Sequence, residues 1–273
     1  MDEKRAGFSL KAPGRPGSDH PRRLPGRGPW PGVDDHLVQP EITRDEIIGG
    51  RRVVASPAQP PHATRHTQLD YVIRALVTPG FTAAADLLTR HDHDSDFATD
   101  VCIFKDGADP ATGTRYLEEV AFEVVSEQNA RLVTEKAVRM HRRGVRRIFA
   151  VRVKKGEVCE WSPESQGWNP LDAGARIEDP CLVAPLAVAA LLDAVAADKA
   201  VAEALIAKGD PTLREREARG IAGSILTVLE ARGIAVSPEQ RQEIERCHDL
   251  ERLDRWLRTA ALASSVEEVL PQT

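Results

Sequence analysis

Residues 95–153 read SDFATDVCIFKDGADPATGTRYLEEVAFEVVSEQNARLVTEKAVRMHRRGVRRIFAVRV, and this stretch decides the fold. Its patterns predict a strand, a turn-rich loop, a second strand, a helix and a third strand, in that order. The first strand carries Asp100, the second carries Glu123, and the helix over residues 130–143 carries Lys136. Two carboxylates on neighbouring strands, followed by a lysine on a helix, suit a divalent metal ion and a phosphodiester.

Glu123 stands in a run of high strand propensity. Val120, Phe122 and Val124 share one face, and Glu123 interrupts the apolar residues of the other face. An ionised carboxylate at such a position is unfavourable unless it is paired, protonated or bound to a metal ion. A solvent-facing position at a sheet edge explains this strand equally well when it is considered alone.

The helix that follows bears on this choice because of where Lys136 lies. The apolar residues of the helix form one stripe, made of Leu132, Val133, Ala137 and Met140. Lys136 falls inside that stripe, so its stem can pack while its ammonium reaches toward the strand ends. There the ammonium can neutralise Glu123 or stabilise the charge that develops on a phosphate.

Length and composition set the frame for this site. The chain has 273 residues, of which 41% are hydrophobic, so one or two domains with a real core are expected. Four scattered cysteines without a CxxC pair indicate reduced thiols in a cytoplasmic protein. No stretch has the length and apolar character of a membrane span or a secretion signal, so neither is expected.

The flanking segments differ in character from the centre. Residues 1–40 contain seven prolines, six glycines and seven Lys/Arg, which predicts a disordered basic tail. Folded structure is expected from residue 41, where Thr43 and Glu46 have the spacing of a helix capping box. The polar run RHDHDSD, residues 90–96, is interpreted as a solvated loop rather than a metal cluster. From residue 185 to residue 273 helical patterns predominate.

The ordered motifs resemble a known family. The runs TDVCIF, VAFEVVSEQ and EKAVRMHRRGVRRIFAV resemble the Uma-type putative restriction endonuclease family of the PD-(D/E)XK nuclease superfamily. Upstream, Glu46, the Ile47–Gly49 turn, Ser56-Pro57 and His62 stand in the order that the family pattern has. The resemblance covers residues 41–162. It implies an α/β fold with a restriction-endonuclease-like mixed central sheet flanked by helices, an αβββαβ core.

The same resemblance implies roles for individual residues. Asp100 and Glu123 would bind Mg²⁺ or Mn²⁺, with the backbone carbonyl of Val124 as a third ligand. Lys136 would be the catalytic lysine, and Glu46 an additional acidic residue near the metal. The chain departs from the superfamily pattern at Val125, where a lysine usually stands, so catalysis would rely on Lys136.

Charge adds an expectation about the substrate. Ten Lys/Arg lie between Arg131 and Lys155 against the single acid Glu135, although the whole chain carries a net charge of -5. Such a basic surface is expected of a protein that binds phosphate backbones, and a solvated helix face explains it equally well. The nucleic-acid contacts expected are His62, Arg139, Arg142 and Arg143. For His62, packing at a helix N-terminus is an open alternative.

These observations predict three segments. They are a disordered tail (1–40), a nuclease-like domain (41–184) and a C-terminal all-helical appendage (185–273) that serves oligomerisation, partner binding or coverage of the core. The predicted function is metal-dependent endonuclease cleavage of DNA by a homo-oligomer. The alternative is a catalytically silent nucleic-acid-binding or assembly protein that keeps the fold.

Overall fold

The central strand of the sheet is β5 (Glu118–Val125), whose residues are almost all buried. It pairs antiparallel with β4 (Ser95–Lys105) on one side and parallel with β6 (Arg147–Arg152) on the other. A parallel neighbour requires a crossover, and helix α2 (Ala130–Arg143) supplies it. Burial on both faces explains why this strand reads as a nearly continuous apolar run.

The computed structural model describes residues 30–38, 45–54, 59–125 and 130–270. Within these residues the main sheet has eight strands in the order β2-β1-β4-β5-β6-β7-β8, with β3 paired to β4. The remaining strands of this sheet are β1 (Asp45–Ile48), β2 (Arg51–Val54), β3 (Phe81–Asp92), β7 (Glu157–Ser162) and β8 (Gly167–Pro170). The tail expected over residues 1–40 lies outside the described residues except for 30–38.

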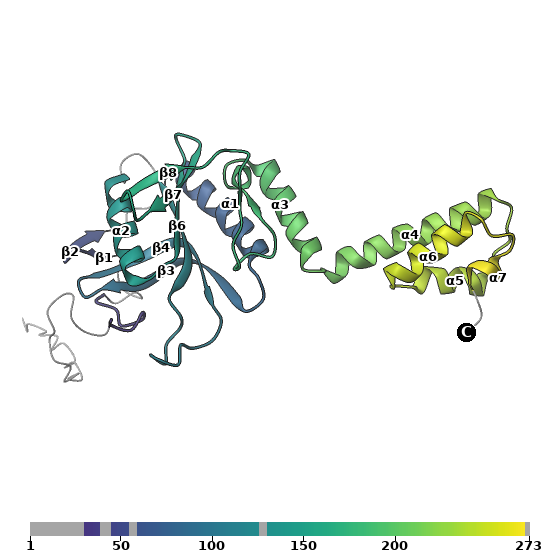
Figure 1. Ribbon diagram of the computed structural model, residues 1–273, viewed down its shortest axis with the longest axis horizontal. Helices are drawn as coiled ribbons and strands as arrows, with labels where there is room; N and C mark the ends of the chain where they lie inside the picture. The colour runs from purple at the N-terminus through teal and green to yellow at the C-terminus, as the bar shows by residue number, and fades with distance from the viewer. Residues whose placement is uncertain (1–29, 39–44, 55–58, 126–129, 271–273) are drawn as a thin grey trace, which may run out of the picture. The chain divides into compact units, whose positions relative to one another are not determined.

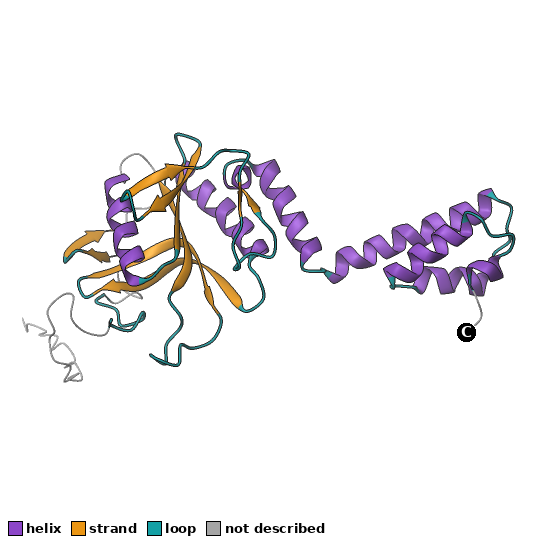
Figure 2. Ribbon diagram, viewed as in Figure 1, coloured by secondary structure: helices purple, strands orange, loops and turns teal. Residues whose placement is uncertain are grey.

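Helices cover both faces of the sheet (Figure 1). Helix α1 (Pro60–Leu76) packs on the face that carries Val101, Phe122 and Val124, and helix α3 (Ala194–Ala207) packs against α1. Helix α2 packs on the opposite face through Ala137 and Met140, against Ala121 and Ile148. The expected mixed sheet flanked by helices is confirmed, and Figure 2 distinguishes the helices from the strands by colour.

The capping box predicted at Thr43 and Glu46 does not begin a helix. Glu46 lies in β1, which pairs with β2 at Ile47↔Arg52 and with β4 at Ile47↔Asp96. Pairing with a strand fifty residues away overrides the local capping pattern, and Thr43 itself lies outside the described residues.

The expected solvated loop at residues 90–96 is also wrong. Arg90, His91 and Asp92 end β3, a turn at residues 93–94 follows, and β4 begins at Ser95. Asp96 in β4 has no exposed surface. The Asp96 carboxylate accepts hydrogen bonds from the backbone N–H of Leu37 and from His36 Nδ1, at 2.8 and 3.0 Å. Arg90 and Asp96 are buried because they hydrogen-bond with residues 35–37, whereas Asp94 in the turn is exposed.

The region around residue 185, where the predicted all-helical appendage begins, is not helical throughout. It contains β9 (Arg176–Ile177), β10 (Leu186–Ala187) and the 3₁₀ helix η2 (Val188–Leu191) before α3 begins. Leu186, Leu191 and Ala204 belong to the same apolar core as α1 and the sheet. Residues of β10, η2 and α3 therefore pack with the core of the sheet, although the predicted domain boundary lies at residue 184.

The C-terminal helices have an apolar core of their own. They are α4 (Pro211–Ala231), α5 (Pro238–Arg246), α6 (Leu250–Ala260) and α7 (Val266–Val269). Ile225, Leu253 and Trp256 are buried in a cluster that contains only residues of this segment. The expected helical C-terminal region is confirmed. No helix of the described part of the chain is both long and apolar enough to span a membrane.

Candidate active site

Asp100 and Glu123 face each other across neighbouring strands. The register of β4 and β5 pairs Val101 with Phe122 and Cys102 with Ala121. One step further along this antiparallel register places Asp100 opposite Glu123, on the face that α2 covers. The structure thus brings together the two carboxylates that the sequence predicts as metal ligands.

Lys136 completes this group from helix α2. Its side chain lies on the buried stripe of the helix, and its Nζ lies 4.0 Å from Glu123 Oε2. The same ammonium donates to Glu46 Oε1 at 2.9 Å and to the Ala98 carbonyl at 3.0 Å. It also lies 5.2 Å from the centre of the Phe97 ring, a favourable cation–π contact. Lys136, which is expected to replace the lysine missing at position 125, therefore points into the site and not into solvent.

Glu46 reaches the site from β1. Its Oε1 accepts hydrogen bonds from the Lys136 ammonium and, at 3.0 Å, from the backbone N–H of Ala98. The side chain is nearly buried, so the ion pair with Lys136 is shielded from water. Glu46 thereby fixes where the ammonium of Lys136 sits.

The residue after Glu123 contacts Asp100 through its backbone. The N–H of Val124 donates to Asp100 Oδ2 at 2.6 Å, which orients the aspartate. Val125, at the usual lysine position of the superfamily, packs with Val133 and Ala150. Its apolar surroundings leave the charged role at the site to Lys136.

Burial sets the proton affinities of the two carboxylates. It raises the pKa of Glu123 well above its ordinary value, against the opposing effect of the Lys136 ammonium. Burial likewise raises the pKa of Asp100, again opposed by Lys136. Burial alone would lower the pKa of Lys136, but Glu123, Glu46 and Asp100 together raise it. The ammonium stays charged, and the site holds more carboxylate than one lysine neutralises.

One oxygen of Glu123 has no hydrogen-bond partner. Oε1 is buried and unpaired within the described residues, and the whole residue is only 3% exposed. Such a carboxylate oxygen is unfavourable unless a cation or a proton occupies the space beside it. The donor set of Glu123 and Asp100, two hard carboxylates, fits Mg²⁺ or Mn²⁺.

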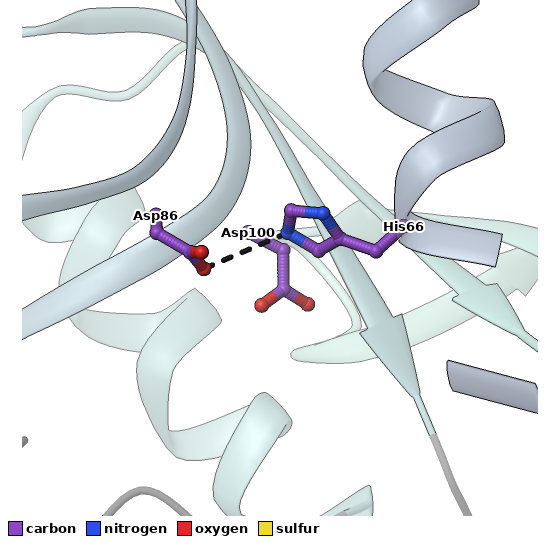
Figure 3. A group of neighbouring side chains, drawn as sticks. All are labelled: His66, Asp86 and Asp100. Carbon is purple, nitrogen blue, oxygen red and sulfur yellow. Dashed lines mark ion pairs between the residues drawn. The ribbon is translucent and has the colours of Figure 1, made fainter. Parts of the chain in front are cut away.

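Two further residues at the site, His66 and Asp86, were not predicted from the sequence. His66 on α1 lies beside Asp86 of β3 and Asp100, and the three side chains converge in Figure 3. His66 Nδ1 lies 3.1 Å from Asp70 Oδ2, one helical turn along. The i, i+4 spacing of His66 and Asp70 was the available signal. Asp86 gave none, because it lies in an alanine-rich run.

Pairing with these carboxylates changes the charge of His66. The Asp86 carboxylate, 3.6 Å from Nε2, raises the pKa of His66 to about 9, against the effect of burial. The close imidazolium of His66 lowers the pKa of Asp86 in return. In the absence of a bound cation, His66 is therefore an imidazolium held between acids.

The comparisons with known proteins place this chain in a family. The family model "Uma2: Putative restriction endonuclease" matches residues 33–191, which is more than half of the chain. The chain belongs to the Uma2 family. A search of curated proteins found no match. Among solved structures, a "putative nuclease belonging to DUF820" from Anabaena variabilis is similar, with 17% identity and a TM-score of 0.46. That similarity covers 54% of this chain and 89% of the other.

Membership of the Uma2 family confirms the resemblance stated from the motifs. The match begins before residue 41 and ends after residue 162, so it also takes in residues 33–38 and the segment up to η2. Asp100, Glu123, Lys136 and Glu46 all lie within it.

The four side chains expected to contact nucleic acid lie in different environments. Arg139 donates to Ser95 Oγ at 2.7 Å and pairs with Glu135, and Arg143 donates to the Pro31 carbonyl. Arg142 is the most exposed of these three arginines, with 59% of its side chain exposed, and its Nη1 lies 4.0 Å from Asp92 Oδ2. His62 is half-buried, and its ring stacks 6.2 Å from that of His66. Of these residues, His62 is next to the candidate site through His66, whereas Arg142 lies about 9 Å along α2 from Lys136.

Proposed function

We propose that this Uma2 protein hydrolyses phosphodiester bonds of DNA with the help of Mg²⁺ or Mn²⁺. The observation that carries the proposal is the convergence of Asp100, Glu123 and Lys136 from two strands and a helix. The ammonium of Lys136 lies within 4.0 Å of Glu123, which itself stands opposite Asp100 in the sheet register. Carboxylates beside a fixed cationic group suit a reaction in which negative charge builds up on phosphate oxygens.

Asp100 and Glu123 would hold the metal ion, and the backbone carbonyl of Val124 is the proposed third ligand. The unpaired Oε1 of Glu123 supports this assignment, because a buried carboxylate oxygen calls for a cation. A bound ion supplies Lewis acidity to the scissile phosphate and lowers the pKa of a water molecule. The N–H of Val124 holds Asp100 in the orientation that ligation requires.

Lys136 is the proposed catalytic lysine. Its ammonium would stabilise the charge of the phosphate in the transition state or orient the attacking water. Glu46 acts as its positioning residue, because it anchors the ammonium through a 2.9 Å hydrogen bond. The Lys136 ammonium is then already in position before the substrate binds, and this preorganisation makes its charge effective in catalysis.

DNA is the proposed polymer because of the basic residues that follow the site in sequence. Arg142 offers an exposed guanidinium, 4.0 Å from Asp92, for a backbone phosphate, and His62 offers a half-buried ring beside His66. Arg139 and Arg143 would contact DNA only if they gave up their present partners, Ser95 and Pro31.

Plasmid cleavage tests the proposal. The full chain is incubated with supercoiled DNA and Mg²⁺ or Mn²⁺, beside the Asp100→Asn and Glu123→Gln variants. The matched control is Glu119→Gln on the same strand, because Glu119 pairs with Lys105 and Arg146 outside the site. Cleavage by the unchanged chain and by Glu119→Gln, lost in the two site variants and in EDTA, supports the proposal. Equal nicking by all four proteins contradicts it.

One observation favours the alternative, a catalytically silent nucleic-acid-binding or assembly protein. The ammonium of Lys136 already has Glu46 and the Ala98 carbonyl as partners, so it can act as a purely structural cation. DNA binding without cleavage under any divalent metal would support that reading.

We further propose that the chain forms a homo-oligomer through α4 to α7. Leu262, between α6 and α7, is 84% exposed, and the segment has its own buried core. Light scattering of the full chain beside the Leu262→Ser variant tests this assembly. A cytoplasmic location is proposed from the four free cysteines.

A further inference from the structure

His66, Asp86 and Asp100 form a second group of possible metal ligands next to the first. One ligand atom from each lies within 4.8 Å of the others. We propose that these three side chains bind a second divalent cation, with Asp100 shared between the two sites. The inference rests on the proposed function only through Asp100, because His66 and Asp86 play no part in the first site.

The histidine is oriented as a ligand would be. Nδ1 lies 3.1 Å from Asp70 Oδ2 on the same helix, which fixes the ring and leaves Nε2 facing Asp86 and Asp100 (Figure 3). A carboxylate that holds the far nitrogen of a metal-bound histidine is the usual second partner in such sites. Nε2 is buried and has no hydrogen-bond partner within the described residues, since its 3.6 Å distance to Asp86 Oδ1 is too long.

Asp86 reaches this point through an unusual backbone. It lies opposite Asp100, between the pairs Ala85↔Val101 and Leu87↔Thr99, and its φ is 50°. Aspartate tolerates the left-handed region better than most residues, but a strand interior does not normally call for it. Local strain of this kind is found where a side chain serves a function. The Asp86 side chain is 78% exposed, so a cation can enter from solvent.

The spacing agrees with a cation of ordinary size. Ligand atoms lie about 2.0–2.2 Å from a transition metal ion, so two of them stand no more than about 4.4 Å apart. The observed spread of up to 4.8 Å needs a closure of a few tenths of an ångström. Exposed Asp86 can make that movement by rotation of its side chain.

The ligand types indicate which cation the second site prefers. Nitrogen from imidazole favours Mn²⁺ and later transition metals over Mg²⁺, which prefers oxygen ligands and water. The Asp100–Glu123 site offers only oxygen. The two sites would therefore differ in selectivity, and Mn²⁺ is the ion expected to fill both. Two cations that share a carboxylate can stabilise the attacking and the leaving oxygen of a phosphodiester together.

Mn²⁺ binding to the full chain tests the inference. Isothermal titration gives the number of ions, and pulsed electron paramagnetic resonance detects nitrogen coupled to bound Mn²⁺. The unchanged chain is expected to bind two Mn²⁺ and to show nitrogen coupling. Asp86→Asn and His66→Gln are each expected to lose one ion, and His66→Gln to lose the nitrogen signal. Asp70→Asn is expected to weaken the second ion by about 10-fold or more.

Two variants separate this inference from the proposed function. Glu123→Gln is expected to lose the first ion and keep the nitrogen signal, while Asp254→Asn on α6, half-exposed and remote in sequence, is expected to change nothing. If the unchanged chain binds one Mn²⁺, and Glu123→Gln abolishes that binding while Asp86→Asn does not, the second site is overturned and the first remains. If the one bound Mn²⁺ is lost in Asp86→Asn but not in Glu123→Gln, the first site is overturned and the second remains. No bound Mn²⁺ would overturn both.

Discussion

Lys136 on α2 donates to Glu46 on β1 at 2.9 Å, although ninety residues separate them in sequence. The contact ties the first strand of the sheet to the helix that crosses over the central strand. Its consequence is chemical as well as structural, because the ammonium is held 4.0 Å from Glu123 without taking up both oxygens of that carboxylate. Glu46 serves the lysine, which leaves Glu123 and Asp100 for a cation.

Replacing Lys136 with methionine is expected to separate catalysis from metal binding. Cleavage should fall by about 100-fold or more, because the charge that stabilises the phosphate is gone. Mn²⁺ should still bind, since both carboxylates remain. Mn²⁺ should also raise the melting temperature more than in the unchanged chain, because it then offers the only compensation for Glu123. Plasmid cleavage and scanning fluorimetry with and without Mn²⁺ measure these effects.

The control for this variant is Lys155→Met, in the hairpin between β6 and β7, where 62% of the side chain is exposed. It should change neither cleavage nor the response to Mn²⁺. Full cleavage by Lys136→Met would remove the lysine from the mechanism. Loss of Mn²⁺ binding in that variant would mean that the ammonium organises the ligands rather than the phosphate.

The Glu123→Gln substitution is expected to stabilise the metal-free protein. Burial raises the pKa of Glu123 above its ordinary 4.5, so the folded state binds the proton more tightly than the unfolded chain. Stability from this group is therefore lost as pH rises above 4.5 toward the folded pKa. Glutamine has no charge to bury, and the gain should be about 0.5–2 kcal/mol at pH 8. Urea unfolding in EDTA measures it.

Glu119→Gln is the matched control on the same strand. Its carboxylate is paired with Arg146 and Lys105, so glutamine there should leave stability unchanged or slightly lower. If Glu123→Gln lost stability at pH 8 as Glu119→Gln does, Glu123 would be a satisfied core residue and not a strained ligand.

The sequence predicts those site residues that local patterns place, and it misses those that only long-range packing places. The alternation of side chains in strands places Asp100 and Glu123, and the helical stripe places Lys136, so these three residues could be predicted. Glu46 was expected at the site from the resemblance, but not in a strand, because its pairing with β4 is not encoded nearby. His66 and Asp86 meet only through the packing of α1 on β3.

The polar run at residues 90–96 was misread for a related reason. Composition indicated a loop, yet Asp96 is buried because residues 36–38 donate hydrogen bonds to it. Arg90 likewise donates to the Asp35 carbonyl at 2.8 Å. Partners some sixty residues away determine whether such a run is solvated or buried, and no window of the sequence contains both sides.

Truncation should locate the end of the sheet domain. A chain that ends at Gly209 keeps β10, η2 and α3, whose buried residues belong to the core of the sheet. It is expected to melt cooperatively by circular dichroism. A chain that ends at Ala184 loses Leu186, Val188 and Leu191, each without exposed surface. It is expected not to fold, since loss of one buried leucine already costs about 2–5 kcal/mol. Equal melting of both chains would place the boundary at residue 184 after all.

His91 is expected to make the fold sensitive to mild acid. The ring is fully buried against Phe97, 4.2 Å between centroids, and burial lowers its pKa well below 6.5. Below about pH 6.5 the unfolded chain binds a proton at His91, whereas the folded chain does not. The free energy of unfolding therefore decreases as the pH is lowered, by up to about 1.4 kcal/mol per pH unit. His91→Leu should flatten this slope in urea unfolding between pH 7 and pH 5. His248→Leu, at an exposed position, should retain it. Equal slopes in the His91→Leu variant and the unchanged chain would assign the acid sensitivity to other groups.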